Sequence, residues 1–169
     1  GTTVLIRDNR VVGSQTGIRV AATADGMIAR NDVSGNETAL GLVATFDGLV
    51  SANRLHAAKT GIDHAAAADL SGNFVYGNAT GIVSGFTGDA ALGGDPDTLS
   101  NEIFHNAVGV SLSGSMLRQH VYANTVGVRG SGSLVAGDSA HGNLIEGNAT
   151  GVDVAGDVSF NKIAGNGVG

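Results

Sequence analysis

The sequence predicts an all-β solenoid: a single-stranded right-handed parallel β-helix of about eight coils, with three short strands per coil. Three observations support this fold class. A ten-residue pattern recurs along the whole chain, aliphatic and polar residues alternate inside each copy, and small turn residues separate the apolar pieces. Repetition of this kind is typical of solenoids, in which each unit packs only against its neighbours.

The repeated pattern has ten positions, and its clearest copy covers residues 143–152. The first position is Asn, the third is aliphatic, the fifth is small and the sixth is usually Asn. The eighth is Thr or Val, the ninth is Gly and the tenth is aliphatic, while the second, fourth and seventh vary. The third position is aliphatic in every copy, and the eighth is always Thr or Val. The ninth is Gly in all copies but one, where Ala39 replaces it. This agreement predicts one architecture for the whole chain. The copies begin at Asn9, Asn31, Asn53, Asn73, Asn101, Gln119, Asn143 and Asn161.

Each copy divides into three extended pieces. Period-two alternation in the first piece points the third position inward and the second and fourth positions outward. A small residue followed by Asn, as in Gly77-Asn78, then favours a turn with left-handed backbone angles. A second strand follows, with the tenth position inward. A third apolar piece precedes the next copy and includes Ile6, Ile28, Val50, Leu70 and Val158.

The recurring Asn residues have a structural explanation. Equivalent residues in adjacent coils lie about 4.8 Å apart, so each amide side chain can hydrogen-bond to the next as in amide ladders. Gln119 keeps the amide in the one copy that lacks the first Asn. We therefore interpret these residues as part of the scaffold and not as ligand-binding groups.

Length and charge restrict the remaining possibilities. The 169 residues suit a single domain over 1–169, which we expect to be a section of a longer protein, with longer connections at 85–98 and 130–142. A net charge of −6 with nine Lys and Arg argues against a nucleic-acid partner. No apolar run approaches the roughly 20 residues of a membrane-spanning helix, so we expect no membrane insertion. Without Cys, the fold has no disulfides or thiolate metal sites.

The outward second and fourth positions of the third to seventh copies carry the strongest functional signal. Aromatic, imidazole and charged side chains gather there, and rings clustered on one exposed face are typical of a binding site or an interface. We call this set the stripe. It consists of Arg54, His56, Phe74, Tyr76, Glu102, Phe104, His120, Tyr122 and Glu146.

Several readings of the stripe remain open. The rings could stack on one another and stabilise neighbouring coils, or the loop 85–98 could cover them. Their faces could instead contact sugar rings or a cell-surface protein. In a catalytic alternative, Tyr122 with His120, or Tyr76 with His56, would abstract a proton from a uronate; our leading expectation includes no catalytic residue.

We expect no cofactor, although loop carboxylates leave calcium as an alternative. Asp95 and Asp97 are the candidates, together with Asp89 and Asp138, because calcium prefers carboxylate and carbonyl oxygens. Asp residues in Gly-rich turns more commonly bond to their own backbone. A copper or zinc site built from the five His is less favoured.

The units at 93–106 and 143–152 resemble the parallel β-helix repeats of bacterial extracellular proteins. Such repeats occur in pectate-lyase-like folds, alginate epimerases, a periplasmic copper-site maturation protein and large surface proteins. The resemblance implies an extracellular, cell-surface or periplasmic location. Enzyme motifs of these families are missing: Asp95-Pro96 is followed by Asp97-Thr98 where alginate epimerases have Asp-Pro-His-Glu, and the adjacent Asp pairs of polygalacturonase-like enzymes do not occur.

These observations predict a structural or binding segment of a large, adhesin-like bacterial surface protein. Its expected partner is a polysaccharide or a cell-surface protein. The alternative is a fragment of a polysaccharide-active enzyme, either a uronate lyase or a C5-epimerase. Open ends of a β-helix also favour end-to-end self-association.

Overall fold

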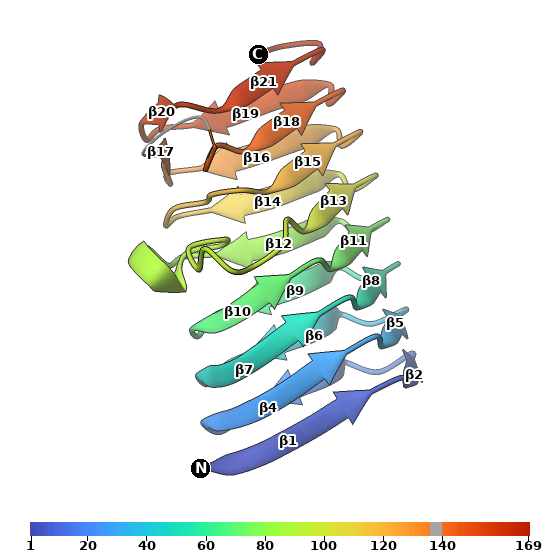
Figure 1. Cartoon of the computed structure of the whole chain (residues 1–169). Helices are drawn as coiled ribbons and strands as arrows, with labels where there is room; N and C mark the ends of the chain where they lie inside the picture. The colour runs from blue at the N-terminus through green and yellow to red at the C-terminus, as the bar shows by residue number, and fades with distance from the viewer. Residues whose placement is uncertain (136–139) are drawn as a thin grey trace.

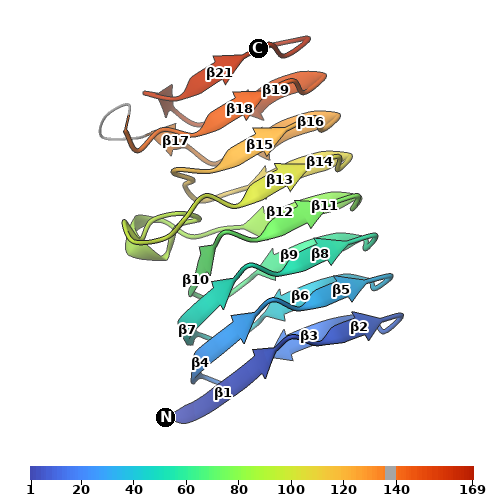
Figure 2. The same ribbon diagram turned by 45° about the vertical axis from the view of Figure 1, so that its right-hand side comes forward.

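The chain folds into a rod of stacked coils (Figures 1 and 2). The computed structural model describes residues 1–135 and 140–169. Strand pairing is parallel throughout the sheets of this part, which confirms the predicted parallel β-helix. No helix in the described ranges has the length and hydropathy required to cross a membrane.

The first piece of each repeat forms the longest sheet, whose strands span positions two to four. In register, the third-position residues pair along the rod, as Val75 pairs with Leu55 and Ile103. Its strands, within the described residues, are β2 (Arg10–Val12), β5 (Asp32–Ser34), β8 (Arg54–His56), β11 (Phe74–Tyr76), β13 (Glu102–Phe104), β15 (His120–Tyr122), β18 (Leu144–Glu146) and β21 (Lys162–Ala164).

The second piece forms a sheet that begins at the eighth position. The ninth-position glycine lets its coils approach closely: a Cβ added at Gly81 would lie 2.5 Å from the carbonyl oxygen of Gly109. The described strands of this sheet are β3 (Thr16–Val20), β6 (Thr38–Leu42), β9 (Thr60–His64), β12 (Thr80–Ser84), β14 (Val108–Leu112), β16 (Val126–Gly130) and β19 (Thr150–Val154).

The third piece is less regular. It forms β1 (Thr2–Arg7), β4 (Ala24–Ala29), β7 (Phe46–Ser51) and β10 (Ala68–Ser71), and later the short pair β17 (Leu134–Val135) and β20 (Val158–Ser159). Between these groups the sheet is reduced to isolated bridges, such as Leu92 with Met116. The loop 85–98 lies there and contains the 3₁₀-helix η1 (Gly88–Ala90). Of the connection expected at 130–142, residues 136–139 lie outside the described residues.

The aliphatic columns form one continuous core. Third-position side chains such as Val33, Val75 and Ile103 are completely buried, as are Leu40 and Ile82 at the tenth position. The predicted alternation of inward and outward residues is therefore confirmed. Burial of these columns supplies the main stabilisation, at roughly 25 cal/mol per Å² of apolar surface.

Two amide ladders run inside the described part of the rod. In each, the side-chain oxygen of one amide accepts hydrogen bonds from both the backbone and the side-chain N–H of the amide one coil earlier, as Asn53 Oδ1 does from Asn31 at 3.0 and 2.9 Å. Gln119 continues the first ladder by accepting from Asn101. The scaffold interpretation of the recurring Asn is thus confirmed. The second ladder contains Asn78, Asn106, Asn124, Asn148 and Asn166.

Candidate functional site

The stripe lies on the outward face of the strands β8, β11, β13, β15 and β18. Parallel pairing in exact register sets its fourth-position side chains directly above one another: His56 beside Tyr76, Tyr76 beside Phe104, and then Tyr122 and Glu146. The sequence therefore predicted correctly which side chains the fold brings together.

The fourth-position rings form a continuous stack. Centroids of His56 and Tyr76 lie 4.8 Å apart with an interplanar angle of 4°. The Tyr76–Phe104 and Phe104–Tyr122 pairs follow at 5.1 and 5.0 Å, with angles of 12° and 10°. Because each inner ring covers its neighbours, Tyr76 and Phe104 present edges to solvent and keep their faces inside the stack. The expectation that their faces could pack against sugar rings is wrong for these two residues.

The second-position row lies beside the stack and consists of Arg54, Phe74, Glu102 and His120. The Phe74 side chain is 42% exposed, whereas the rings of the stack are half-buried. Phe74 forms none of the ring contacts found among the described residues. Its face is consequently more open than those of Tyr76 and Phe104.

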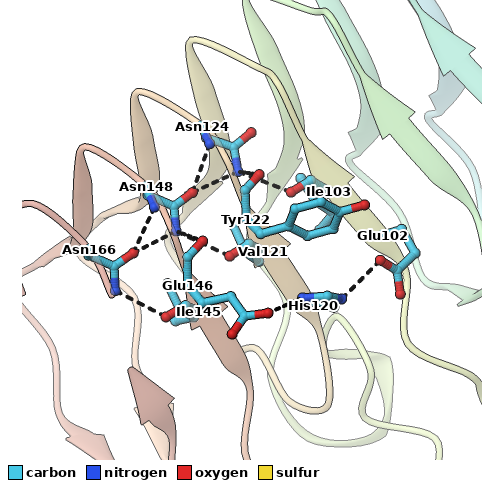
Figure 3. A network of polar contacts seen from close by, with 10 residues as sticks. All are labelled: Glu102, Ile103, His120, Val121, Tyr122, Asn124, Ile145, Glu146, Asn148 and Asn166. Atoms are coloured by element: carbon cyan, nitrogen blue, oxygen red, sulfur yellow. Dashed lines mark hydrogen bonds and ion pairs between the residues drawn. The ribbon is translucent and has the colours of Figure 1, made fainter. Parts of the chain in front are cut away.

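A carboxylate–imidazole–carboxylate network crosses three coils near the C-terminal end of the stripe, which is the upper end in Figure 1 (Figure 3). His120 Nδ1 lies 2.9 Å from Glu102 Oε2, and His120 Nε2 lies 3.1 Å from Glu146 Oε1. A neutral imidazole carries one N–H and can donate to only one of them. Both ring nitrogens of His120 face a carboxylate oxygen, and the contact with Glu146 is a hydrogen bond.

Tyr122 shares this network. Partial burial, and then the charge and hydrogen bond of Glu102, raise the pKa of Tyr122 above its ordinary value. The phenol is thus held neutral as a hydrogen-bond donor. This position does not suit a tyrosine that must lose its proton to act as a base.

A second imidazole contact lies lower on the rod, where His56 Nε2 is 2.8 Å from Asp32 Oδ1. Asp32 was not among the predicted stripe residues. Asp32 occupies the second position of the repeat, one coil before His56 at the fourth position. Side chains at these two positions are diagonal neighbours in the sheet, and this spacing was the signal that could have identified Asp32.

A shallow hollow adjoins this lower end. It is lined by Arg30, Asn31, Asp32, Ala52, Arg54 and Phe74. Arg30 also was not predicted; it holds Asp8 through two hydrogen bonds of 2.8 and 2.7 Å. That contact lowers the pKa of Asp8 and raises that of Arg30.

The loop 85–98 does not cover the stripe, so this reading of the sequence is wrong. The loop follows β12 and projects from the side of the rod away from the turns between β11 and β12 (Figures 1 and 2). There it borders the start of β10, where Asp69, Asp89 and Asp95 line one hollow. The half-exposed stripe remains accessible to solvent.

The four residues of the catalytic alternative do lie close to one another in pairs. His120 and Tyr122 have ring centroids 4.3 Å apart, and His56 stacks on Tyr76. However, both nitrogens of His120 already face carboxylates. The arrangement suits a stable hydrogen-bonded surface better than a proton-transfer pair.

The calcium candidates form a local turn. Asp95 Oδ1 accepts a hydrogen bond from the backbone N–H of Asp97 at 2.8 Å, as in an Asx turn. The pKa of nearby Asp69 is raised by its burial and by Asp95 and Asp47. Within residues 1–135 and 140–169, no three His, Asp or Glu side chains are arranged to hold a metal ion. Asp138 lies outside the described residues.

Part of the chain matches a known family. Residues 2–81 match the family model described as periplasmic copper-binding protein (NosD). This match supports the parallel β-helix repeat but does not point to the pectate-lyase-like members of that architecture. Its periplasmic description agrees with the expected location outside the cytoplasm. No curated protein and no solved structure matches the chain.

The residues described here do not fit copper. Copper in proteins is held by imidazole, thiolate and thioether groups, and the chain has no Cys. His120 is engaged on both ring nitrogens, while His64 and Met116 are buried in the core. We therefore derive no chemistry from a copper ion.

Proposed function

We propose that this chain is a non-catalytic segment of an extracellular or periplasmic protein, and that its stripe binds a linear glycan lying along the rod. The observation that carries the proposal is the unbroken row of stacked rings with charged and hydroxyl groups beside it. The family match supports only the coarser part of this proposal, a periplasmic or surface β-helix domain.

The spacing of the coils favours an extended polysaccharide. Equivalent side chains repeat about every 4.8 Å along the rod, which is comparable to the length of one sugar unit in an extended chain. A glycan aligned with the rod would meet the same kind of side chain at each successive unit. The repeating ligand and the repeating protein surface would then match in period.

Contact would be made through ring edges, hydroxyl groups and the second-position row. The Tyr76 and Tyr122 hydroxyls can donate and accept hydrogen bonds, and Glu102 and Glu146 can accept them from sugar hydroxyls. The ring stack and the amide ladders fix these groups before a ligand arrives. Such preorganisation reduces the entropy lost on binding.

The enzymatic alternative, a uronate lyase or C5-epimerase fragment, has less support. It would need Tyr122 or His120 to abstract a proton, yet the pKa of Tyr122 is raised and His120 is held between two carboxylates. Incubation with uronic-acid polymers would test it. Ultraviolet-absorbing unsaturated product, or a change in sugar configuration, would support the enzyme and contradict our proposal.

Binding can be tested by calorimetric titration with a panel of oligosaccharides. The informative variant is Tyr76→Phe with Tyr122→Phe, because Phe104 shows that phenylalanine fits the stack. The loss of two hydroxyls, each worth about 1 kcal/mol in a hydrogen bond, should weaken binding roughly thirtyfold.

The control is Asp63→Asn with Arg129→Gln, which changes two outward residues of the second sheet. This variant should bind like the wild type. The proposal would be contradicted if the double tyrosine variant and the control bound every glycan with equal affinity, or if the protein bound no glycan of the panel. Thermal unfolding of each variant confirms that the coils remain folded.

A further inference from the structure

We infer that the hollow at the lower end of the stripe is a subsite for an anionic sugar ring, one that carries a carboxylate or a sulfate. This inference rests on the proposed glycan-binding function and names the class of glycan. It is supported by the shape of the hollow, one unpartnered guanidinium, one open aromatic face and the distribution of charge along the rod.

The hollow lies at the corner between two sheets. Arg30 and Ala52 follow the ends of β4 and β7, while Arg54 and Phe74 come from β8 and β11. Its volume of about 280 Å³ is close to the lower limit of ligand pockets, about 300 Å³. It can take one ring of a longer chain, with the rest of that chain continuing along the stripe.

Arg54 supplies the anion-binding group. Its side chain is exposed, and the guanidinium forms no hydrogen bond or ion pair within residues 1–135 and 140–169. A guanidinium presents its N–H groups in a planar fork that matches a carboxylate or sulfate in a bidentate arrangement. Arg30 already holds Asp8 and Asp32 already contacts His56, so Arg54 is the group left for a ligand.

Phe74 supplies the apolar wall. In register it lies one coil above Arg54, and its 42% exposed side chain stands outside the ring stack. A sugar ring placed on this face would pack its C–H groups against the phenyl group. Its anionic substituent would then point down the rod toward the guanidinium.

The charge along this face also favours an anionic ligand at this end. Although the chain carries a net charge of −6, four of its nine basic residues lie at this corner or beside it in the first three coils, namely Arg7, Arg10, Arg30 and Arg54. The two carboxylates there, Asp8 and Asp32, are engaged by Arg30 and His56. The opposite end of the stripe carries Glu102 and Glu146 around His120. A local basic region on an acidic protein attracts anions and orients them.

The test compares three oligosaccharides of equal length by calorimetric titration: an oligouronate, a sulfated neutral oligomer and the unmodified neutral oligomer. The anionic oligomers should bind more tightly than the neutral one, and their advantage should shrink as salt is added. The tighter of the two identifies carboxylate or sulfate as the recognised group.

Arg54→Gln should weaken binding of the preferred anionic oligomer at least tenfold, because a hydrogen-bonded charge pair is lost, and should leave the neutral oligomer unaffected. Arg129 is an exposed arginine on β16, and Arg129→Gln is the matched control, which should leave the affinity for all three oligomers unchanged. Phe74→Ala should weaken all three.

Two outcomes would overturn the inference. If the neutral oligomer binds as tightly as the anionic ones, or if Arg54→Gln behaves like Arg129→Gln, the hollow is not an anion subsite, although glycan binding by the stripe stands. If none of the three oligomers nor any glycan of the wider panel binds, the proposed function fails together with this inference.

Discussion

The fifth position of the repeat shows how single residues determine the turns of the rod. Every described copy has a positive φ there, between 52° and 73°. Glycine adopts this conformation freely, but Ala57, His105 and Ala123 adopt it at a cost, because the left-handed region brings Cβ close to the backbone. These three turns therefore contain backbone strain that their glycine equivalents avoid.

Ala57→Gly should consequently stabilise the protein. Removal of a left-handed strain of about 1 kcal/mol outweighs the added flexibility of the unfolded chain, so the melting temperature should rise by a few degrees. Ala79→Gly is the control: Ala79 is equally exposed but has an ordinary φ. There glycine should lower the melting temperature, and a decrease in both variants would contradict the explanation.

His64 is a polar residue within an aliphatic column. It pairs in register with Leu42 and Ser84, is 1% exposed, and places Nδ1 2.8 Å from Ser84 Oγ. Burial, which outweighs an opposing contact with the backbone of Ala68, lowers the pKa of His64 to about 4. The folded protein therefore keeps this imidazole neutral at pH values where the unfolded chain protonates it.

Acid should destabilise the fold through His64. Above pH 6.5 neither state binds a proton there, and the residue contributes no pH dependence. Between 6.5 and about 4 the unfolded state binds more protons, so the free energy of unfolding falls as the pH falls. The loss is roughly 3 kcal/mol at about 1.4 kcal/mol per pH unit.

The measurement is urea unfolding at pH 7 and pH 4.5 for the wild type and for His64→Leu with Ser84→Ala. Leucine already occupies this column at Leu42 and Leu112. The variant should lose clearly less stability than the wild type in acid, since the other titrating groups are common to both. Equal losses would show that His64 is not responsible.

At the scale of the elements, the amide ladders join one coil to the next. Asn101 occupies the middle of the first ladder: its side-chain oxygen accepts from the Asn73 backbone at 2.9 Å, and its own amide donates to Leu70 and Gln119. All of these groups are buried. Removal of one amide would leave several of them without partners, at about 1–3 kcal/mol each.

Asn101→Ala should thus lower the free energy of unfolding by at least about 3 kcal/mol. Asn9 occupies the same repeat position in the first coil but is exposed, and Asn9→Ala should cost less than about 1 kcal/mol. Chemical denaturation of both variants makes the comparison. Similar losses for the two would mean that the ladder adds little beyond local packing.

The coils were predictable from the sequence because each repeat position has one environment. A third-position aliphatic such as Ile103 is inward in every coil, so pattern alone assigns it. The loop 85–98 interrupts the pattern, and its direction depends on tertiary packing against β10, which no local signal encodes. The sequence could likewise align the stripe residues. It could not show that the inner rings cover one another's faces, because ring orientation depends on packing between coils.

The contacts Asp32–His56 and Arg30–Asp8 join positions in different coils, and in the first case different columns. A comparison of single columns does not pair Asp32 with His56, because these two residues belong to neighbouring columns. Asp8 and Arg30 share the column just before the ten-residue pattern, so a comparison limited to the pattern misses them too. These contacts matter for the proposed subsite because they occupy Asp32 and Arg30 and leave the Arg54 side chain available.

On the scale of the whole molecule, the rod separates scaffold from surface. The inward columns and the ladders are nearly uniform, whereas the outward face changes from basic at Arg54, through aromatic at Tyr76 and Phe104, to acidic at Glu146. A rigid scaffold with a graded face can bind an extended ligand in one direction and register. Ligand binding should therefore need no rearrangement of the coils.

The most direct test of this account is an NMR titration of the isotope-labelled chain with the tightest-binding oligosaccharide of the panel. Amide and side-chain signals should shift for Arg54, Phe74, Tyr76, Tyr122 and their neighbours on the same face, while those of the second sheet, such as Asp63 and Arg129, stay in place. Shifts confined to the second sheet, or no shifts with any glycan, would contradict the assignment of the stripe as a glycan-binding face.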